Sequence, residues 1–311
     1  MSHLTRTLPV RLLCVAGIAG LFFGSNGAAA ELGFDPAAIE TITGVKGARN
    51  DAEGVFKVSL PRTDVPVTVE GWKIPPFMGL TSWAAFKAGG MGMAGMAMVM
   101  GDTVLFEDEV NPAMSAAFAH GLEVTALHNH FFFDEPKVYF MHIGGSGKAA
   151  DLAAGVKAVW DAIAQTRAAH PSIARQFTAQ GLPATNAVTA APLEKIIGAQ
   201  AQQNAGMVKF TIGREVKMGD GGTATKEMGV STWAAFAGSD DNAVVDGDFA
   251  ATGGELQAAL KSLRADGIAI VAIHSHMSDD TPHLFFLHYW GRGRAADLAA
   301  SVKRALATQG R

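Results

Sequence analysis

The chain has 311 residues, of which 49% are hydrophobic and 17% charged, and its formal net charge is −4. This composition is typical of a packed globular protein and excludes an extensively disordered one, and the length allows two ordinary domains. The chain has no basic cluster, so we do not expect nucleic acid as a partner.

The first thirty residues differ from the rest of the chain. Arg6 and Arg11 precede an apolar run at 12–23, and small residues follow up to Ala30. A basic start, a short apolar stretch and an A-x-A site are typical of a secretory signal peptide, and the run is too short to span a bilayer comfortably. We therefore expect residues 1–30 to be removed, a periplasmic or secreted protein, and no stable membrane span after cleavage.

The only cysteine, Cys14, lies inside this segment. Cleavage would leave a chain without thiols, which excludes disulfides, thiolate metal ligands and cysteine nucleophiles. It would also remove two arginines and no acidic residue, so the net charge would become 23 − 29 = −6.

The rest of the chain repeats itself. Residues 78–86 match 228–236 at an offset of 150, and residues 99–152 match 245–298 at a steady offset of 146. Such self-similarity indicates a tandem duplication. We expect a first repeat at 31–168, a proline-containing linker at 169–192, and a second repeat at 193–311.

Each repeat has the same predicted order of elements. A strand (97–105 and 243–249) is followed by a helix (110–120 and 254–265), an apolar strand (123–130 and 268–276), its hairpin partner (137–144 and 283–290) and a closing helix (151–166 and 295–306). This order predicts an α+β fold of two homologous repeats, each a mainly antiparallel sheet with packed helices.

Three histidines recur in each repeat with the spacing H-x-H-x11-H. Side chains alternate along a strand, so the first two histidines share one face, and a hairpin would place the third opposite the second at about 5 Å. Converging imidazoles suit zinc, with copper, iron or manganese as alternatives, whereas a structural polar network is the other interpretation. The candidate ligands are His128, His130 and His142, and His274, His276 and His288.

Four acidic residues are candidates for a further ligand or for acid–base catalysis. Glu109 matches Glu255, and Asp102 matches Asp248. A glutamate beside three histidines can bind the metal or accept a proton from bound water. Each pair also has a structural alternative, because a glutamate can begin the following helix and Gly-Asp is a common turn.

A methionine-rich stretch in the first repeat raises the possibility of a Cu(I) site, because thioethers bind that ion. Methionine is also an ordinary filler of irregular cores, which is the alternative interpretation. The residues concerned are Met91, Met93, Met96, Met98 and Met100.

The histidine motifs resemble those of the bacterial LppY/LpqO family. The matching blocks are Leu-His-Asn-His-Phe at 127–131, Phe-Met-His-Ile-Gly-Gly at 140–145, and their counterparts at 273–276 and 287–291. Residues 98–102 and 109–112 are similar to the family too, so the resemblance covers nearly all of the chain after residue 30. It implies an exported bacterial protein of unknown function. Without a suitably placed lipobox cysteine, the chain departs from the lipoprotein pattern.

Three functions stay open at this point. The first is an exported metal-binding protein with a three-histidine cluster in each repeat. The second is a metal-dependent hydrolase or oxidoreductase whose open histidine site leaves a coordination position for water, dioxygen or substrate. The third is an envelope ligand-binding module with structural histidines. The expected partner is a metal ion or a small molecule.

Overall fold

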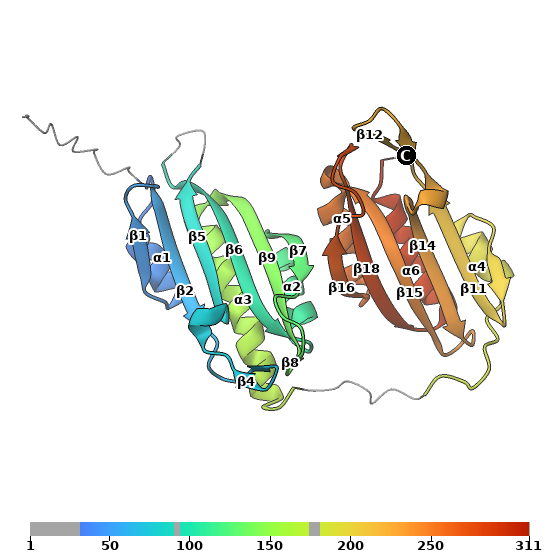
Figure 1. Cartoon of the computed structure of the whole chain (residues 1–311), viewed down its shortest axis with the longest axis horizontal. Helices are drawn as coiled ribbons and strands as arrows, with labels where there is room; N and C mark the ends of the chain where they lie inside the picture. Colours follow the sequence, from blue (N-terminus) through green and yellow to red (C-terminus); the bar gives the residue numbers. More distant parts are fainter. Residues whose placement is uncertain (1–31, 90–93, 174–180, 311) are drawn as a thin grey trace, which may run out of the picture.

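A computed structural model of the chain describes residues 32–89, 94–173 and 181–310. These residues form two repeats of one α+β unit, which lie side by side (Figure 1). The predicted fold class and the tandem duplication are therefore confirmed.

The first repeat has a six-stranded antiparallel sheet in the order β1-β2-β5-β6-β9-β7. Its strands are β1 (Gly47–Asn50), β2 (Val55–Pro61), β5 (Thr81–Ala88), β6 (Met96–Phe106), β9 (Val138–Lys148) and β7 (Glu123–His128). Three helices pack on this sheet, α1 (Pro36–Thr43), α2 (Val110–Ala119) and α3 (Ala149–Ala169). A small sheet follows the order β4-β3-β8, and a 3-10 helix precedes β5: β4 (Trp72–Lys73), β3 (Thr68–Val69), β8 (Asp134–Glu135) and η1 (Pro76–Met78).

The second repeat has the same arrangement. Its main sheet contains β10 (Gln202–Asn204), β11 (Met207–Gly213), β14 (Ser231–Gly238), β15 (Ala243–Thr252), β18 (Leu284–Gly293) and β16 (Ala269–His274). Its remaining elements are α4 (Ala190–Ile197), α5 (Gly253–Ala265), α6 (Ala295–Ala307), η2 (Lys226–Met228), β13 (Thr223–Ala224), β12 (Val216–Met218) and β17 (Asp280–Thr281). Helix α4 begins inside the stretch expected to be a linker, because Leu193 and Ile197 are buried in the core.

The two main sheets join into one sheet of twelve strands. The edge strands β7 and β16 pair at Leu127 and Ile273. Side-chain amides reinforce this contact in both directions. Gln257 accepts from the Val124 N–H at 3.0 Å and donates to its carbonyl oxygen at 2.8 Å. At the matching place, Asn111 accepts from the Ile270 N–H at 2.9 Å. Because each amide binds the backbone of the other repeat, the two repeats hold each other in register.

The helices and the histidines lie on opposite faces of the sheet. In β6, Val99 and Leu105 belong to the core that includes the helices. Side chains alternate along a strand, so Met100 and Asp102 point to the other face, which we call the open face. The small sheets lie at one end of each main sheet (Figure 1). Among the helices of the described residues, none has the length and apolar character that crossing a membrane requires.

Candidate metal centre

The strand pairing brings an aspartate and a histidine together on the open face of each repeat. Asp102 of β6 lies opposite His142 of β9, and Asp248 of β15 lies opposite His288 of β18. The sequence predicted these four residues as site residues, and the antiparallel register makes each pair cross-strand neighbours. On the open face, one aspartate carboxylate thus lies beside His142 in the first repeat and one beside His288 in the second.

The predicted hairpin register of the histidines, with His130 opposite His142, is wrong by four residues. Ala126 lies opposite His142, and His128 lies opposite Phe140, so His130 lies beyond the end of β7. The error has a structural cause. The chain does not turn directly from β7 into β9 but first forms β8, which pairs with β3 in the small sheet. A bulge between Val124 and Ala126 also shifts the pairing.

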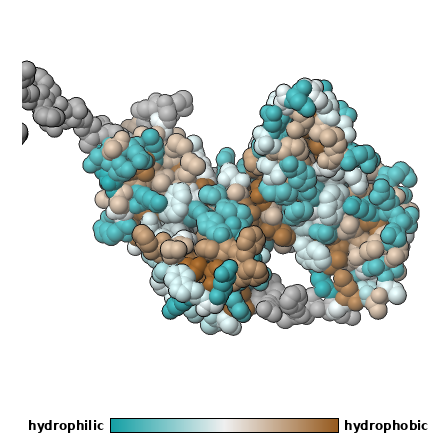
Figure 2. All heavy atoms as spheres, viewed as in Figure 1, coloured by the Kyte–Doolittle hydropathy of each residue, from teal (hydrophilic) through white to brown (hydrophobic). Residues whose placement is uncertain are grey.

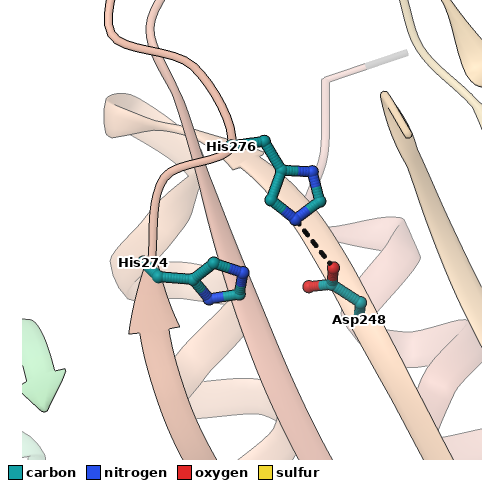
Figure 3. Close-up of side chains that lie close together, drawn as sticks. All are labelled: Asp248, His274 and His276. Atoms are coloured by element: carbon teal, nitrogen blue, oxygen red, sulfur yellow. Dashed lines mark ion pairs between the residues drawn. The ribbon is translucent and has the colours of Figure 1, made fainter. Parts of the chain in front are cut away.

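The second repeat contains a compact group of possible metal ligands. One ligand atom each from Asp248, His274 and His276 can be chosen so that all lie within 4.8 Å of one another. His276 Nε2 is 3.2 Å from Asp248 Oδ2, and the aspartate side chain is only 4% exposed. Figure 3 shows His274 at the end of β16 pointing toward this pair. Two imidazoles and one carboxylate therefore converge from two strands and a loop.

The first repeat has the same residues in a different spacing. His128 Nε2 and His130 Nε2 are 3.3 Å apart, whereas His130 Nε2 is 3.9 Å from Asp102 Oδ2. Around a zinc ion with bonds of about 2.0–2.1 Å, tetrahedral ligand atoms lie about 3.3 Å from each other. The two imidazole nitrogens of the first repeat therefore already have the separation of two ligands on one ion.

Several polar atoms of these clusters are buried without a hydrogen-bond partner. Within the described residues, they are Asp102 Oδ1, His128 Nδ1, Asp248 Oδ1 and His274 Nδ1. Leaving such an atom unpaired costs about 1–3 kcal/mol, so buried polar groups normally have partners. The same two positions are unpaired in both repeats, which makes an accidental gap in one site a poor explanation.

Burial also favours the neutral form of the imidazoles, which is the form that binds metals. Desolvation lowers the pKa of His274 below its ordinary value, although Asp248 opposes the shift. Desolvation likewise lowers the pKa of His128 and His130, and the neighbouring His142 adds to the effect in both. At neutral pH these rings therefore keep a free nitrogen lone pair.

Backbone and aromatic contacts orient the loop histidine of each cluster. The Nδ1 of His276 is 3.2 Å from the Gly229 carbonyl oxygen, so a proton on Nδ1 leaves Nε2 free toward Asp248. The His276 ring stacks on Phe286 at 3.5 Å between centroids, and His130 stacks on Phe140 at 3.4 Å. These supporting residues were not predicted from the sequence. The Met-Gly pair that recurs at 78–79 and 228–229 was the available signal.

The third histidine of each predicted triad does not belong to the compact group. His288 stacks on His274 with 4.8 Å between centroids and 10° between planes, and His142 stacks on His128 at 5.1 Å and 7°. Imidazole lone pairs lie in the ring plane, so two parallel stacked rings cannot both direct a lone pair at one ion. In the second repeat, Asp248 takes the place that the sequence analysis gave to His288.

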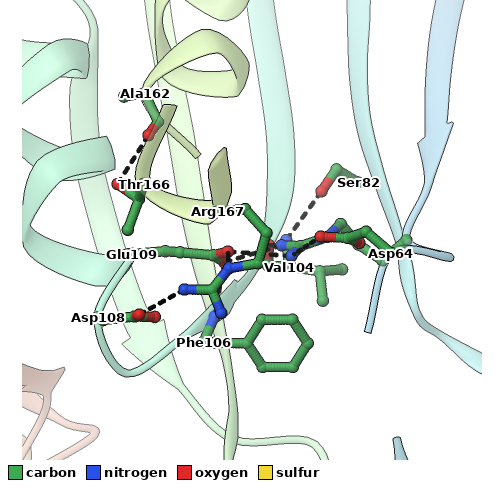
Figure 4. Close-up of polar contacts among 10 residues, drawn as sticks. Asp64, Ser82, Val104, Phe106, Asp108, Glu109, Ala162, Thr166 and Arg167 are labelled. Atoms are coloured by element: carbon green, nitrogen blue, oxygen red, sulfur yellow. Dashed lines mark hydrogen bonds and ion pairs between the residues drawn. The ribbon is translucent and has the colours of Figure 1, made fainter. Parts of the chain in front are cut away.

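The candidate acid–base residues Glu109 and Glu255 are bound by arginines instead. The Glu109 carboxylate accepts from Arg62 at 2.9 and 3.1 Å and lies 3.3 Å from Arg167 Nε (Figure 4). Glu255 accepts from Arg214 at 2.6 Å and caps α5. Burial opposes ionisation of Glu255, but Arg214 and the N–H of Thr252 outweigh it and lower the pKa.

Among the described residues, neither glutamate makes a hydrogen bond or ion pair with a histidine, so their contacts are structural. Glu109 begins α2, as the structural interpretation of the sequence expected. The Arg–Glu pair recurs in both repeats because in each the arginine also donates to the backbone of the neighbouring long strand, at Val104 and Ala250.

The methionines considered for Cu(I) are only partly described. Met91 and Met93 lie outside the described residues. Met98 and Met100 are exposed on the open face, so they do not fill a core. Together with His142, Glu123 and other residues they line a hollow of about 400 Å³. This hollow lies directly beside the first histidine cluster.

Comparisons with known proteins agree with the duplication. Residues 37–162 and 191–308 both match the sequence model of a family described as Domain of Unknown Function (DUF1259). No curated protein is significantly similar to the chain. The crystal structure of a trimeric bacterial microcompartment shell protein, PduB, is similar over 83% of this chain and 88% of that chain, at 12% identity and a TM-score of 0.19. A likeness at this TM-score carries no argument.

Proposed function

The chain belongs to the family described as Domain of Unknown Function (DUF1259), and because that description gives no activity, we propose a function from the site itself. We propose that the protein binds a divalent transition metal ion in each repeat, through two imidazoles and one carboxylate. The proposed ligands are Asp248, His274 and His276 in the second repeat and Asp102, His128 and His130 in the first.

One observation carries this proposal. In the second repeat, three ligand atoms lie within 4.8 Å of one another, and the buried Asp248 Oδ1 of the same group has no hydrogen-bond partner in the described part of the chain. A cation beside these ligand atoms would offset the charge of the buried carboxylate. The geometry fits a metal better than a closed network of hydrogen bonds.

The ligand chemistry restricts the ion. Neutral imidazole nitrogen with one carboxylate oxygen suits zinc, copper, iron or manganese, whereas calcium and magnesium prefer all-oxygen sites. We propose zinc first, because its tetrahedral ligand spacing of about 3.3 Å matches the 3.2 Å and 3.3 Å separations in the two repeats.

A metal-dependent enzyme is the second candidate, and the exposure of the site favours it. The side chains of His276 and His130 are 31% and 36% exposed, so each cluster opens to solvent. Three protein ligands leave one tetrahedral position for water or substrate, as in catalytic zinc sites. The hollow beside His142 would give a small substrate room next to the first cluster. Hydrolysis and redox chemistry both fit this arrangement.

Metal titration of matched variants tests the proposal. We expect the wild-type chain to retain zinc after dialysis, measured by elemental analysis and calorimetry, and Asp248→Asn to lower the affinity of one site at least about tenfold. Asp246→Asn is the control, because Asp246 lies two positions away on the same strand, is exposed, and carries the same charge. Equal and negligible metal in all three proteins would refute metal binding and favour an envelope ligand-binding module with structural histidines.

We also infer that the protein is exported to the periplasm or beyond. The composition of residues 6–30 and the resemblance to the LppY/LpqO family support this inference. Mass spectrometry of the protein recovered from the exported fraction would test it, and a chain that still begins at Met1 in the cytoplasm would contradict it.

A further inference from the structure

Five large apolar side chains are exposed at one end of the first repeat. Their exposed fractions are 99% for Phe77, 83% for Phe132, 80% for Phe133, 58% for Trp72 and 54% for Met78. We call this group the aromatic tip. Figure 2 shows hydrophobic side chains gathered at the lower end of the first repeat, over the region of η1 and β4 in Figure 1.

The aromatic tip comes from three segments that touch one another. Strand β3 pairs with both β4 and β8, so Trp72 and the residues next to Phe133 belong to one small sheet. The Glu70 N–H also donates to the Phe133 carbonyl oxygen at 3.3 Å. The neighbouring Phe131 ring packs close to Gly79, which ends η1. The segments that carry the five side chains therefore lie together at this end of the first repeat.

The second repeat shows that the fold does not need the three phenylalanines of the aromatic tip. The loop after the histidines has the same course in both repeats, and both contain a 3-10 helix before the next strand. Yet three of the matching positions in the second repeat are polar: Phe77 corresponds to Glu227, Phe132 to Ser278 and Phe133 to Asp279. Met78 differs, because it corresponds to Met228, which is also apolar and exposed. The three exposed phenylalanines are thus a property that the first repeat alone carries.

The backbone at Phe133 adds a second cost. Its φ is +56°, in the left-handed region that bulky residues rarely adopt. The chain therefore holds a large aromatic ring in water on an unfavourable backbone, and no core contact compensates, because the ring is 80% exposed. Features that oppose folding without an internal gain indicate an external contact.

We propose that the aromatic tip inserts into the interfacial layer of a lipid bilayer. Its side chains project singly, with exposure up to 99%, and lipids can close around separate rings, whereas a protein partner must provide a matching pocket for each. Trp and Phe are enriched in segments that lie in membrane interfaces. The proposal rests on these exposed side chains and not on the proposed metal sites.

The charges around the aromatic tip indicate which lipid headgroups its binding to a bilayer requires. Lys73 and Lys137 are balanced by Glu70 and Glu135, and Lys137 already forms an ion pair with Asp134. No excess of positive charge selects anionic lipid, so neutral phosphatidylcholine vesicles are the appropriate probe.

Vesicle flotation tests the proposal directly. The protein would span residues 31–311, which contain every described helix and strand and lack the apolar run at 12–23. The test variant, Phe77→Glu/Phe132→Ser/Phe133→Asp, takes its residues from the second repeat, where the matching loop has the same secondary structure. Met228→Glu is the control, because Met228 is 68% exposed at the matching place in the second repeat.

We expect the wild type and the control to float with the vesicles, and the triple variant to bind at least tenfold less while keeping the same far-UV circular dichroism and melting temperature. Brominated lipid should quench fluorescence of the wild type more than that of Trp72→Phe. Wild type that stays at the bottom of the gradient, or equal flotation of the triple variant, would overturn the proposal. So would a lipid-free dimer that the triple variant converts to monomer, because the tip would then bind a second copy.

Discussion

Replacing Glu109 by alanine should lower the free energy of unfolding by about 3 kcal/mol. The glutamate side chain is fully buried, and the guanidinium groups of Arg62 and Arg167 that share it are 6% and 9% exposed. Removing one partner of a buried ion pair costs about 3–5 kcal/mol, because the opposite charge stays buried. Each arginine keeps a second carboxylate, Asp64 and Asp108 respectively, so the lower end of that range applies.

The second repeat supplies the matched comparison for this change. Glu255 is 15% exposed and has one arginine partner that is 19% exposed, so Glu255→Ala should cost about 1–2 kcal/mol. Urea unfolding, followed by circular dichroism, measures both losses, and metal content per folded chain should not change in either variant. Wild-type stability of Glu109→Ala together with lost metal or activity would refute the structural role and restore Glu109 as a site residue.

Three further predictions concern the backbone, the contact between repeats, and pH. Gly229→Ala should weaken metal binding in the second repeat, because its φ of +86° is one that alanine rarely adopts, and the resulting backbone change would move the carbonyl that orients the His276 imidazole. Gln257→Ala leaves the Val124 N–H and carbonyl without the amide that binds them, so stability should fall by about 1–3 kcal/mol and the Val124 amide should exchange faster with solvent. Although burial opposes it, the pKa of Glu255 is lowered by its arginine and backbone partners. Its contribution is therefore present above the unfolded pKa of about 4.3 and lost as pH falls through the folded value.

Each of these predictions has a result that contradicts it. Gly221→Ala changes a glycine with the same φ of +86° but open surroundings, so equal metal loss in both glycine variants would remove the special role of Gly229. Unchanged hydrogen exchange at the Val124 amide in Gln257→Ala would show that the Gln257 side chain does not protect this amide. A difference in stability between wild type and Glu255→Gln that grows as pH falls below about 4.3 would contradict the sign of the pKa shift.

Much of the fold could be predicted from the sequence because the duplication doubled each signal. A single histidine pair in an apolar strand is weak, but the same spacing at an offset of 146 identified the two repeats and their main strands. The expected strand at 123–130 ends instead at His128, and the expected hairpin at 137–144 extends to Lys148. Periodicity locates such elements well and their ends poorly.

The geometry of the site could not be predicted from spacing alone. Predicting His142 as the third ligand assumed that the strand before it turns straight back, whereas the intervening residues form β8 in a separate small sheet. A two-residue strand carries almost no sequence signal, yet it moves the cross-strand partner of His142 to Ala126. The spacing of the histidines in the sequence predicted which residues lie near the site. The pairing of strands that are distant in the sequence determines which of these residues contact one another.

The duplication also separates what the site requires from what each repeat adds. Both repeats keep the aspartate and the two histidines of the H-x-H pair. Both also keep the phenylalanine that stacks on the second of these histidines and the glycine that lies near it. They differ in the loops that follow, which carry Phe132 and Phe133 in one and Ser278 and Asp279 in the other. One chain could therefore hold two similar metal sites in different surroundings, with the first next to an apolar surface and the second next to water. Metal occupancy measured with and without vesicles would separate the two sites, because only the first should respond to lipid.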